Sequence, residues 1–213
     1  MTVQFLFRDL RASAPSGLAL TRTAQRIFLV AGLLFVGSAA YTFAARDVWQ
    51  ALESWKFDRA LSRGPSLPAA SGVPSPMAQP VVRISVPRLH IAAMVKEGAD
   101  DRTLAVAVGH IPSTALPGRP GNVGLAAHRD TLFRSLKDVR TDDTIILSTW
   151  KGEYVYRVIW HKVVNPSDVT VLSSVGDEEL LTLVTCYPFY FVGNAPKRFI
   201  VRARRITSLP PVN

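Results

Sequence analysis

Residues 27–45 form an uninterrupted apolar stretch that contains no charged side chain. As a helix with a rise of ~1.5 Å per residue it would extend about 28 Å, close to the ~30 Å thickness of the hydrocarbon core of a bilayer. The stretch is also longer than the apolar core of a typical signal peptide. We therefore predict an uncleaved transmembrane helix, with cleavage at the small residues 38–45 as the alternative.

The charges on the two sides of this stretch predict its orientation. Four arginines and one acidic residue come before it: Arg8, Arg11, Arg22, Arg26 and Asp9. Residues 46–59, which follow it, hold three basic and three acidic side chains. An excess of positive charge is retained in the cytoplasm. We therefore expect residues 1–26 inside the cell and the rest outside the cell membrane, in the periplasm if an outer membrane is present.

Residues 46–80 separate this helix from the remainder of the chain. Val48, Leu52 and Trp55 recur at spacings of four and three, which indicates either a helix that continues past the bilayer or a frayed helical stalk. Residues 62–80 are dominated by Pro, Ser, Ala and Gly. Such a composition buries no core, so we predict a semi-extended linker that holds the following domain away from the membrane.

One folded domain is expected over residues 81–206, with residues 207–213 as a tail. Apolar alternation between turn residues predicts strands at 81–86, 91–95, 122–127, 145–150, 153–164, 169–172, 180–186 and 198–204. Residues 104–110 fit a strand or a short helix, and residues 131–136 fit a helical turn. Roughly seven or eight short strands with little helix predict an all-β barrel or sandwich.

The net charge of +9 raises the question of a nucleic-acid partner. Part of this charge belongs to the N-terminal arm, where it sets the orientation in the membrane. The other basic residues are scattered singly, without an arginine-rich helix or a recognition motif, so we expect no nucleic-acid binding. A basic domain outside the membrane is better suited to anionic lipid or wall polymer.

Cys186 is the only cysteine of the 213 residues. An intramolecular disulfide and a metal site built from several thiolates are therefore excluded. The apolar run 180–184 predicts a buried strand that ends near Pro188 and brings the thiol to its end. A small buried core residue is the alternative, because free cysteines are often buried. As a nucleophile, Cys186 would need a base or a positively charged neighbour.

His128 is the best candidate for that base. It directly follows the predicted small-residue strand 122–127, so its imidazole lies at a strand end, as the Cys186 thiol does. His90 and His161 stand beside apolar residues in strand-like contexts, where packed or surface roles are usual. His110 ends an element before a turn-rich loop, and we keep it as a candidate substrate contact.

Arg198 could stabilise negative charge near the thiol. It comes twelve residues after Cys186, at the start of the last predicted strand. If residues 187–197 form a loop, antiparallel pairing of its two flanks brings Arg198 close to Cys186. A guanidinium is always charged and offers several donors to a carbonyl oxygen. The alternative is a solvated cation at a strand end, which is how we interpret Lys197 and Arg202.

Together these residues resemble the signature of the sortases, the membrane-anchored cysteine transpeptidases of bacteria. The resemblance rests on Leu183-Val184-Thr185-Cys186 ahead of Arg198 and on Ala127-His128-Arg129-Asp130-Thr131, and it extends through Gly109-His110-Ile111-Pro112 and Pro117-Gly118. The sequences around Cys186 and at Ala195-Pro196-Lys197-Arg198-Phe199 are most similar to class D sortases, of the proteobacterial type. One departure is Ala127, where a glycine usually precedes the histidine.

The resemblance implies a closed eight-stranded β-barrel that binds a sorting signal of the kind Leu-Pro-any-Thr-Gly on secreted proteins. It implies that Cys186 attacks the Thr carbonyl and forms a thioacyl enzyme. His128 would protonate the leaving amine, and Arg198 would bind the substrate backbone and stabilise the oxyanion. An amine of a wall precursor or of another protein would then take the acyl group. Thr185 is a further candidate substrate contact through its hydroxyl, with an ordinary strand residue as the alternative.

No metal or organic cofactor is needed for this chemistry, and we expect none. The paired acids Asp100-Asp101 and Asp142-Asp143 have the sequence context of ordinary turns. Two other functions stay open: a purely hydrolytic cysteine endopeptidase, and a tethered non-catalytic module that binds wall polymer or lipid. The second predicts that Cys186, His128 and Arg198 are dispensable together.

Overall fold

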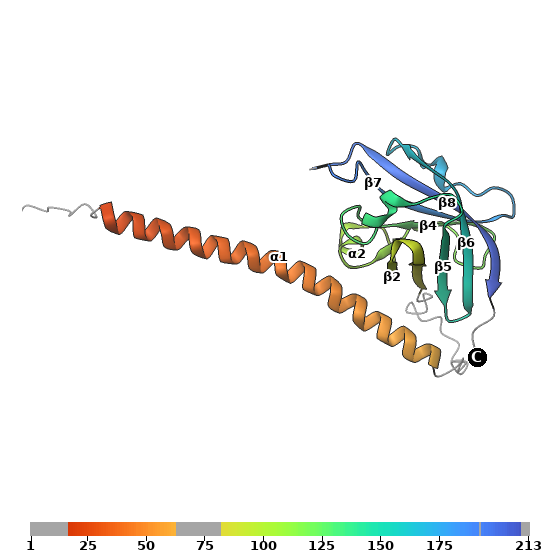
Figure 1. Ribbon diagram of the computed structural model, residues 1–213, viewed down its shortest axis with the longest axis horizontal. Coiled ribbons are helices and arrows are strands. Elements are labelled where there is room, and N and C mark those ends of the chain that lie inside the picture. Colours follow the sequence, from red (N-terminus) through yellow and green to blue (C-terminus); the bar gives the residue numbers. More distant parts are fainter. Residues whose placement is uncertain (1–16, 63–81, 192, 210–213) are drawn as a thin grey trace, which may run out of the picture. The chain divides into compact units, whose positions relative to one another are not determined.

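The computed structural model describes residues 17–62, 82–191 and 193–209 (Figure 1). The chain forms two compact units, one ending at Ala44 and one beginning at Ala45. The predicted N-terminal arm up to residue 16, the linker residues 63–80 and the end of the tail lie outside the described residues.

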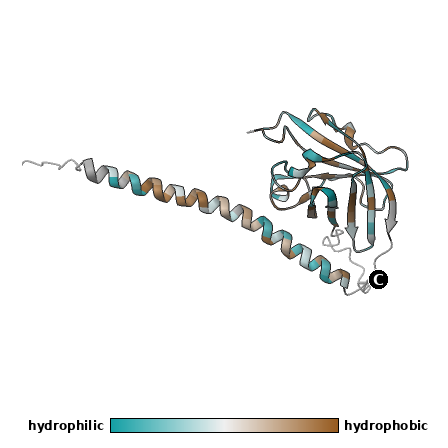
Figure 2. Ribbon diagram, in the orientation of Figure 1, coloured by the Kyte–Doolittle hydropathy of each residue, from teal (hydrophilic) through white to brown (hydrophobic). Residues whose placement is uncertain are grey.

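Helix α1 runs from Gly17 to Ser62 and contains the apolar stretch 27–45. Its part Ala24–Ser62 is long and apolar enough to cross a membrane, and it contains an 18-residue window with a mean hydropathy of 2.0. Figure 2 shows hydrophobic residues gathered in the N-terminal half of the helix and more hydrophilic ones toward its C-terminal end. Large apolar side chains of the stretch, such as Leu34 and Phe35, are exposed. The helix therefore has the length and composition of the predicted membrane anchor.

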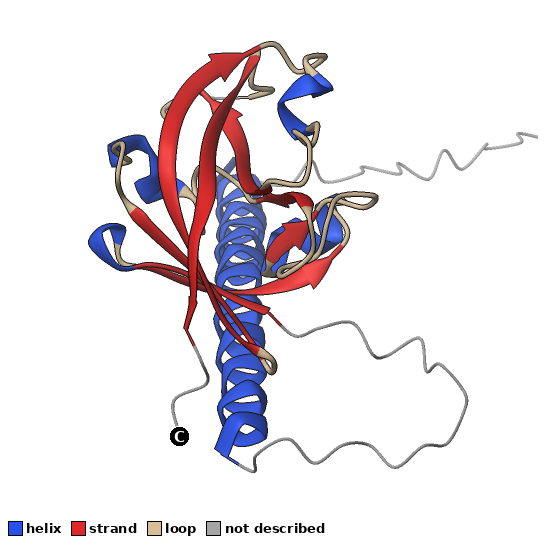
Figure 3. Ribbon diagram, turned by 90° about the vertical axis from the view of Figure 1, so that its right-hand side faces the viewer, coloured by secondary structure: helices blue, strands red, loops and turns tan. Residues whose placement is uncertain are grey.

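The second unit is built on a closed barrel of eight strands, as the resemblance implied (Figure 3). The strands are β1 Val82–Val86, β2 Ile91–Glu97, β3 Val108–His110, β4 Gly121–Ala126, β5 Thr144–Thr149, β6 Gly152–Val164, β7 Glu179–Tyr187 and β8 Lys197–Leu209. Their order around the barrel is β1-β2-β3-β4-β7-β8-β6-β5. The β2–β3 and β4–β7 pairs are parallel, and the others are antiparallel.

Alternation along each strand decides which side chains fill the barrel. On β7, Leu181 and Leu183 are fully buried members of the main core, as are Val123 and Leu125 on β4. Successive side chains of a strand point to opposite faces. Thr182 and Val184, which alternate with these leucines, therefore point outward. Burial of one face fixes the register, because a slip of one residue would turn the core leucines toward solvent.

Two predicted elements differ from the structure. Residues 104–110 divide into helix α2, Asp101–Val106, and strand β3, because the Asp100 side chain accepts hydrogen bonds from the Arg102 and Thr103 amides and so caps the helix. The predicted strand 169–172 is a 3-10 helix, η3, Val169–Leu172. It packs on the outward face of the barrel, and its Val171 carbonyl accepts a hydrogen bond of 2.6 Å from Arg202.

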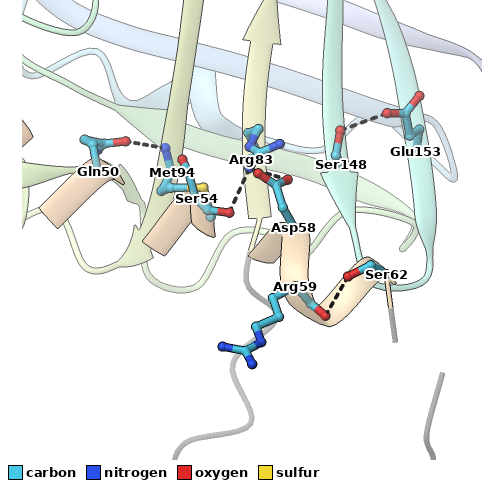
Figure 4. A network of polar contacts seen from close by, with 9 residues as sticks. All are labelled: Gln50, Ser54, Asp58, Arg59, Ser62, Arg83, Met94, Ser148 and Glu153. Carbon is cyan, nitrogen blue, oxygen red and sulfur yellow. Dashed lines mark hydrogen bonds and ion pairs between the residues drawn. The ribbon is translucent and has the colours of Figure 1, made fainter. Parts of the chain in front are cut away.

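The C-terminal part of α1 packs on the outer face of β1 and β2 (Figure 4). The Gln50 amide accepts from the Met94 backbone N–H at 2.8 Å and donates to the Val106 carbonyl at 2.7 Å. Further along the helix, the Arg83 guanidinium lies 2.8 Å from the Asp58 carboxylate, and Phe57 is buried. These contacts make residues 45–62 part of the same unit as the barrel.

Helix α1 continues past the apolar stretch to Ser62, which is one of the two interpretations of the spacing of Val48, Leu52 and Trp55, and these three side chains are exposed. The face that packs on the barrel is determined by the Gln50 amide, which satisfies two backbone groups at once, and by the buried ring of Phe57. Neither contact is visible from apolar spacing, because both depend on strands that come later in the chain.

Asp143 is a buried carboxylate with a fixed set of donors. Arg88 of the short 3-10 helix η1, Pro87–Leu89, forms a bidentate ion pair with it, and the Arg140 amide donates to it at 2.8 Å. These hydrogen bonds, that of Arg88 above all, hold the pKa of Asp143 below its usual value. The acid pair 142–143 therefore has a structural role in this turn.

Replacing Asp143 by alanine should lower the free energy of unfolding by about 2 kcal/mol at pH 7, because Arg88 and the Arg140 amide lose their acceptor. Since the folded-state pKa lies below the unfolded value of about 3.9, this stabilisation is present above about pH 4 and is lost as the pH falls through the folded pKa. Urea unfolding of parent and Asp143→Ala at pH 7 and pH 3 measures it. The difference should shrink at pH 3. A constant or larger difference would show that the stabilisation does not come from the ionised carboxylate.

Candidate active site

Strands β7 and β8 place Cys186 and Arg198 directly opposite each other. Their antiparallel register pairs Cys186 with Arg198 and Val184 with Ile200. This confirms the pairing predicted from the twelve-residue spacing. Directly opposed residues of neighbouring strands project from the same face of a sheet. The thiol and the guanidinium therefore start from adjacent positions on one surface, and both side chains are half-buried.

Strand β4 brings His128 to the same place. It runs parallel to β7 with Ala126 opposite Val184, and the Ala127 amide extends the pairing by donating to the Val184 carbonyl at 3.2 Å. His128 lies two residues beyond Ala126, just as Cys186 lies two residues beyond Val184. The imidazole is half-buried at this end of the barrel.

An apolar strip on the outward face leads to Cys186. Because Leu181 and Leu183 fill the barrel, Val184 and Cys186 point outward. Next to Val184 lies a small apolar cluster formed by β6, β8 and η3: Trp160, Val164, Val171, Leu172 and Ile200. Val164, Val171 and Ile200 are buried within this cluster, so the apolar surface beside β7 consists of the partly exposed Trp160, Leu172 and Val184.

The Arg198 guanidinium is held by the loop that precedes it. Its Nη1 donates to the Ala195 carbonyl at 3.2 Å and to the Lys197 carbonyl at 3.0 Å. The side chain is therefore oriented by the β7–β8 loop as well as by its own strand. This explains how an arginine with five donors can be positioned near the thiol while some of those donors are left for another ligand.

Thr185 has a different position from the one predicted. It lies on the inward face, is 2% exposed, and its hydroxyl donates to the Ala127 carbonyl at 2.7 Å. The hydroxyl is therefore occupied and out of reach of a substrate on the outward face. It binds the backbone immediately before His128, so Thr185 links the strand of the thiol to the segment of the imidazole.

Replacing Thr185 by valine should lower the free energy of unfolding by about 1 kcal/mol and reduce kcat more than it changes KM. The reason is that the lost hydrogen bond holds the chain before His128 and does not touch substrate. Peptide-cleavage kinetics and thermal unfolding measure both effects, with the exposed Thr144→Val as the matched control. A raised KM with unchanged kcat would restore Thr185 as a substrate contact.

The structure does not bring His110 to the thiol. It pairs with Leu125, whose side chain belongs to the core, so the His110 ring also faces inward. Its Nδ1 lies 2.6 Å from the Glu97 carboxylate, and its Nε2 lies 3.0 Å from the Ala115 carbonyl. His110 is therefore not placed to contact substrate, contrary to the prediction. It is a buried polar link between β2, β3 and the following loop.

Residues that sequence reasoning did not single out also surround the site. Arg129 and Lys137 both reach the aromatic pair Tyr190-Phe191 in the β7–β8 loop. The sequence does place these residues near the candidate site, since Arg129 directly follows His128 and the aromatic pair closely follows Cys186. Which cation meets which ring depends on the packing of the two loops, which no local pattern encodes.

Within the described residues, no three His, Cys, Asp or Glu side chains gather as a metal site would require. The paired acids that were predicted to be turn residues include Asp100, which caps α2, and Asp143, which forms an ion pair with Arg88. The expected independence from metal and cofactor stays a prediction.

Comparison with known proteins identifies the family. Residues 84–206, more than half of the chain, match the model of the sortase domain family. The chain belongs to the sortase family. It is 35% identical to Sortase D of Bacillus subtilis over 124 residues, which is 58% of this sortase and 63% of that relative. The putative sortase YwpE of the same organism is 30% identical over 70 residues, 31% of this sortase and 68% of that protein.

Solved structures agree on the fold of this sortase. A sortase D5 transpeptidase of Clostridium perfringens aligns with a TM-score of 0.55 and 28% identity, covering 61% of this sortase and 80% of that chain. Sortase C-1 of Actinomyces oris aligns with a TM-score of 0.56 and 31% identity, covering 61% of this sortase and 76% of that chain. The sortase spans less than two thirds of the length of Sortase D. None of these relatives is proteobacterial, so that part of the predicted resemblance is not supported.

Proposed function

We propose that this sortase is a cysteine transpeptidase in which Cys186 is the nucleophile, His128 the acid–base residue and Arg198 the oxyanion-stabilising residue. The observation that supports it most directly is the strand register. It sets Cys186 opposite Arg198 and brings His128 to the neighbouring strand end. A thiol, an imidazole and a guanidinium gathered at one end of a rigid barrel supply a nucleophile, a proton carrier and a positive charge.

The proposed reaction has two halves. The Cys186 thiolate attacks the carbonyl carbon of the Thr residue in a Leu-Pro-any-Thr-Gly signal, and Arg198 stabilises the negative oxygen that develops. The bond to the Gly nitrogen breaks as His128 donates a proton to that nitrogen, which leaves the acyl group on sulfur. An amine then attacks the thioester carbonyl, loses its proton to His128, and releases the thiolate.

The apolar strip beside the thiol suits the first residues of such a signal. The partly exposed Val184 and Leu172 offer contacts to the Leu and Pro side chains of a peptide that approaches Cys186 along the outward face.

The anchor and the acceptor complete the proposal. Residues 27–45 would hold the enzyme in the cell membrane with its N-terminus in the cytoplasm and the barrel on the opposite side. Secreted proteins that carry the signal would be joined to an amine of a wall precursor or of another protein. A class D assignment is supported by the 35% identity to Sortase D.

The experiment incubates the full chain in detergent with a Leu-Pro-any-Thr-Gly peptide, with and without a small amine, and identifies products by mass spectrometry. We expect cleavage only at the bond between Thr and Gly. Without amine the product should be the free acid that ends in Thr, and the ligated product should replace it as the amine concentration rises. Cleavage that yields only the free acid at every amine concentration would favour a hydrolytic endopeptidase. Absence of any cleavage of this signal would contradict the proposed specificity.

A further inference from the structure

Arg129 connects the loop between β7 and β8 to the segment that carries His128. Its Nη2 donates to the carbonyl of Phe191 at 2.6 Å and to the carbonyl of Gly193 at 3.1 Å. Its guanidinium carbon also lies 5.9 Å from the centroid of the Phe191 ring. In the described part of the chain, Nη1 of Arg129 is buried without a hydrogen-bond partner, so the bonds from Nη2 carry this connection.

The loop that Arg129 holds is the one that orients Arg198. Residues 188–196 join Cys186 to Arg198, and the Ala195 carbonyl accepts a hydrogen bond from the Arg198 guanidinium. On the other side, Arg129 follows His128 directly in the chain, and the His128 carbonyl accepts from the Phe133 amide at 3.2 Å. A continuous chain of contacts therefore runs from His128 through Arg129 and the loop to Arg198.

A second contact joins the same two segments less firmly. Lys137 of the 3-10 helix η2, Arg134–Asp138, lies 2.5 Å from the Tyr190 hydroxyl and 5.2 Å from the centre of its ring. Both side chains are exposed, and exposed cation–aromatic contacts contribute little. The half-buried Arg129 binds two backbone carbonyls, which cannot rotate away as a side chain can. Arg129 is therefore the stronger of the two contacts.

We infer that Arg129 is a positioning residue. By fixing the β7–β8 loop against the His128 segment, it holds the imidazole and the Arg198 guanidinium in their working positions around the Cys186 thiol. The inference rests on the proposed roles of these three residues. Misplacement of a reacting group by ~1 Å can cost about a hundredfold in rate, so a contact far from the substrate can have a large effect.

The test uses the full chain in detergent and compares the parent with Arg129→Ala, Arg129→Lys and His128→Ala. The rate of Cys186 alkylation by iodoacetamide is measured at pH 7, which needs no knowledge of the substrate. A positioned base that accepts the thiol proton activates the sulfur as a nucleophile. We therefore expect His128→Ala to be alkylated more slowly than the parent, and Arg129→Ala to be slowed in the same direction by a smaller factor.

Peptide cleavage gives the second measurement. Arg129→Ala should lower kcat by about ten- to a hundredfold with little change in KM. Arg129→Lys, which can bind one carbonyl, should recover part of the loss. Phe191→Ala removes the ring but leaves both carbonyls, so its loss should stay below about fivefold. Arg134→Ala, an exposed arginine of the same segment, is the matched control and should behave as the parent.

Each outcome bears on one part of the inference. If Arg129→Ala lowers the melting temperature but keeps the parent alkylation rate and kcat, Arg129 stabilises the fold only and the inference is wrong. If His128→Ala itself alkylates as the parent does, the proposed thiol–imidazole pair fails, and the inference fails with it. If Arg129→Ala does not fold, Arg129→Lys and Phe191→Ala still test the inference. The expected order of kcat is parent highest, then Phe191→Ala, then Arg129→Lys, and any other order would contradict the inference.

Discussion

Cys186→Ala should abolish both peptide cleavage and ligation, with a residual rate at least about a thousandfold below that of the parent. The reason is chemical, since in the proposed reaction the thiol sulfur carries the acyl group between the two halves and no other cysteine can replace it. The substitution is conservative for the fold because the side chain is small and half-buried on the outward face. Product formation is measured by mass spectrometry at matched enzyme concentrations.

Two controls separate loss of chemistry from loss of structure. Cys186→Ser keeps the size and hydrogen-bonding capacity of the side chain, but its hydroxyl is far harder to ionise, so we expect it to be inactive as well. Both variants should bind the peptide with a Kd near that of the parent and unfold at the parent temperature. Unchanged turnover in either variant would show that Cys186 is not the nucleophile. Absence of turnover in the parent, with peptide or polymer binding that survives the loss of Cys186, His128 and Arg198, would favour the non-catalytic binding module.

Arg198→Ala should lower kcat/KM by about a hundred- to a thousandfold, most of it in kcat. Arg198 pairs with Cys186 in the β7–β8 register and its guanidinium donates to the Ala195 carbonyl. In the proposed mechanism it meets charge that develops on a carbonyl oxygen only as the thiolate attacks. Arg198→Lys should recover a small part of this loss, because an ammonium keeps the charge but lacks the planar fork of donors. Steady-state peptide cleavage measures both variants.

The matched control for Arg198 is Arg204, six residues further along β8. Its side chain is exposed and forms an ion pair with Glu178, a kind of contact that contributes little at a surface. We expect Arg204→Ala to stay within about twofold of the parent. Equal losses in the two alanine variants would indicate a general effect of charge on β8. A raised KM with unchanged kcat for Arg198→Ala would limit Arg198 to substrate binding.

The features that the sequence predicted are those encoded by short-range patterns. The short apolar run 180–184 predicted a buried strand, and the spacing from Cys186 to Arg198 predicted a strand pair joined by a loop. Both are correct because a short apolar run bounded by a proline suits a buried strand, and a loop of this length allows its flanks to pair. The family resemblance then supplied the number of strands and the closure of the barrel.

The features that it did not predict depend on partners far away in the chain. Thr185 was expected to face substrate, but its hydroxyl finds the Ala127 carbonyl, 58 residues earlier. Residues 169–172 have strand-forming side chains, yet they form the 3-10 helix η3. The carbonyl of Val171 in this helix accepts a hydrogen bond from Arg202 on β8. In each case a buried polar group has to be satisfied, and the partner is chosen by the assembled barrel rather than by the local sequence.

The most direct test of the mechanism is to observe the acyl group on the enzyme. The full chain is mixed with the sorting-signal peptide, quenched in acid at short times, digested, and analysed by mass spectrometry. We expect a peptide containing Cys186 that carries the acyl part of the signal up to its Thr residue, and this adduct should disappear when an amine is added before the quench, as ligated product appears. Peptide cleavage that proceeds without an adduct on Cys186, or that persists in Cys186→Ala, would contradict a thioacyl enzyme.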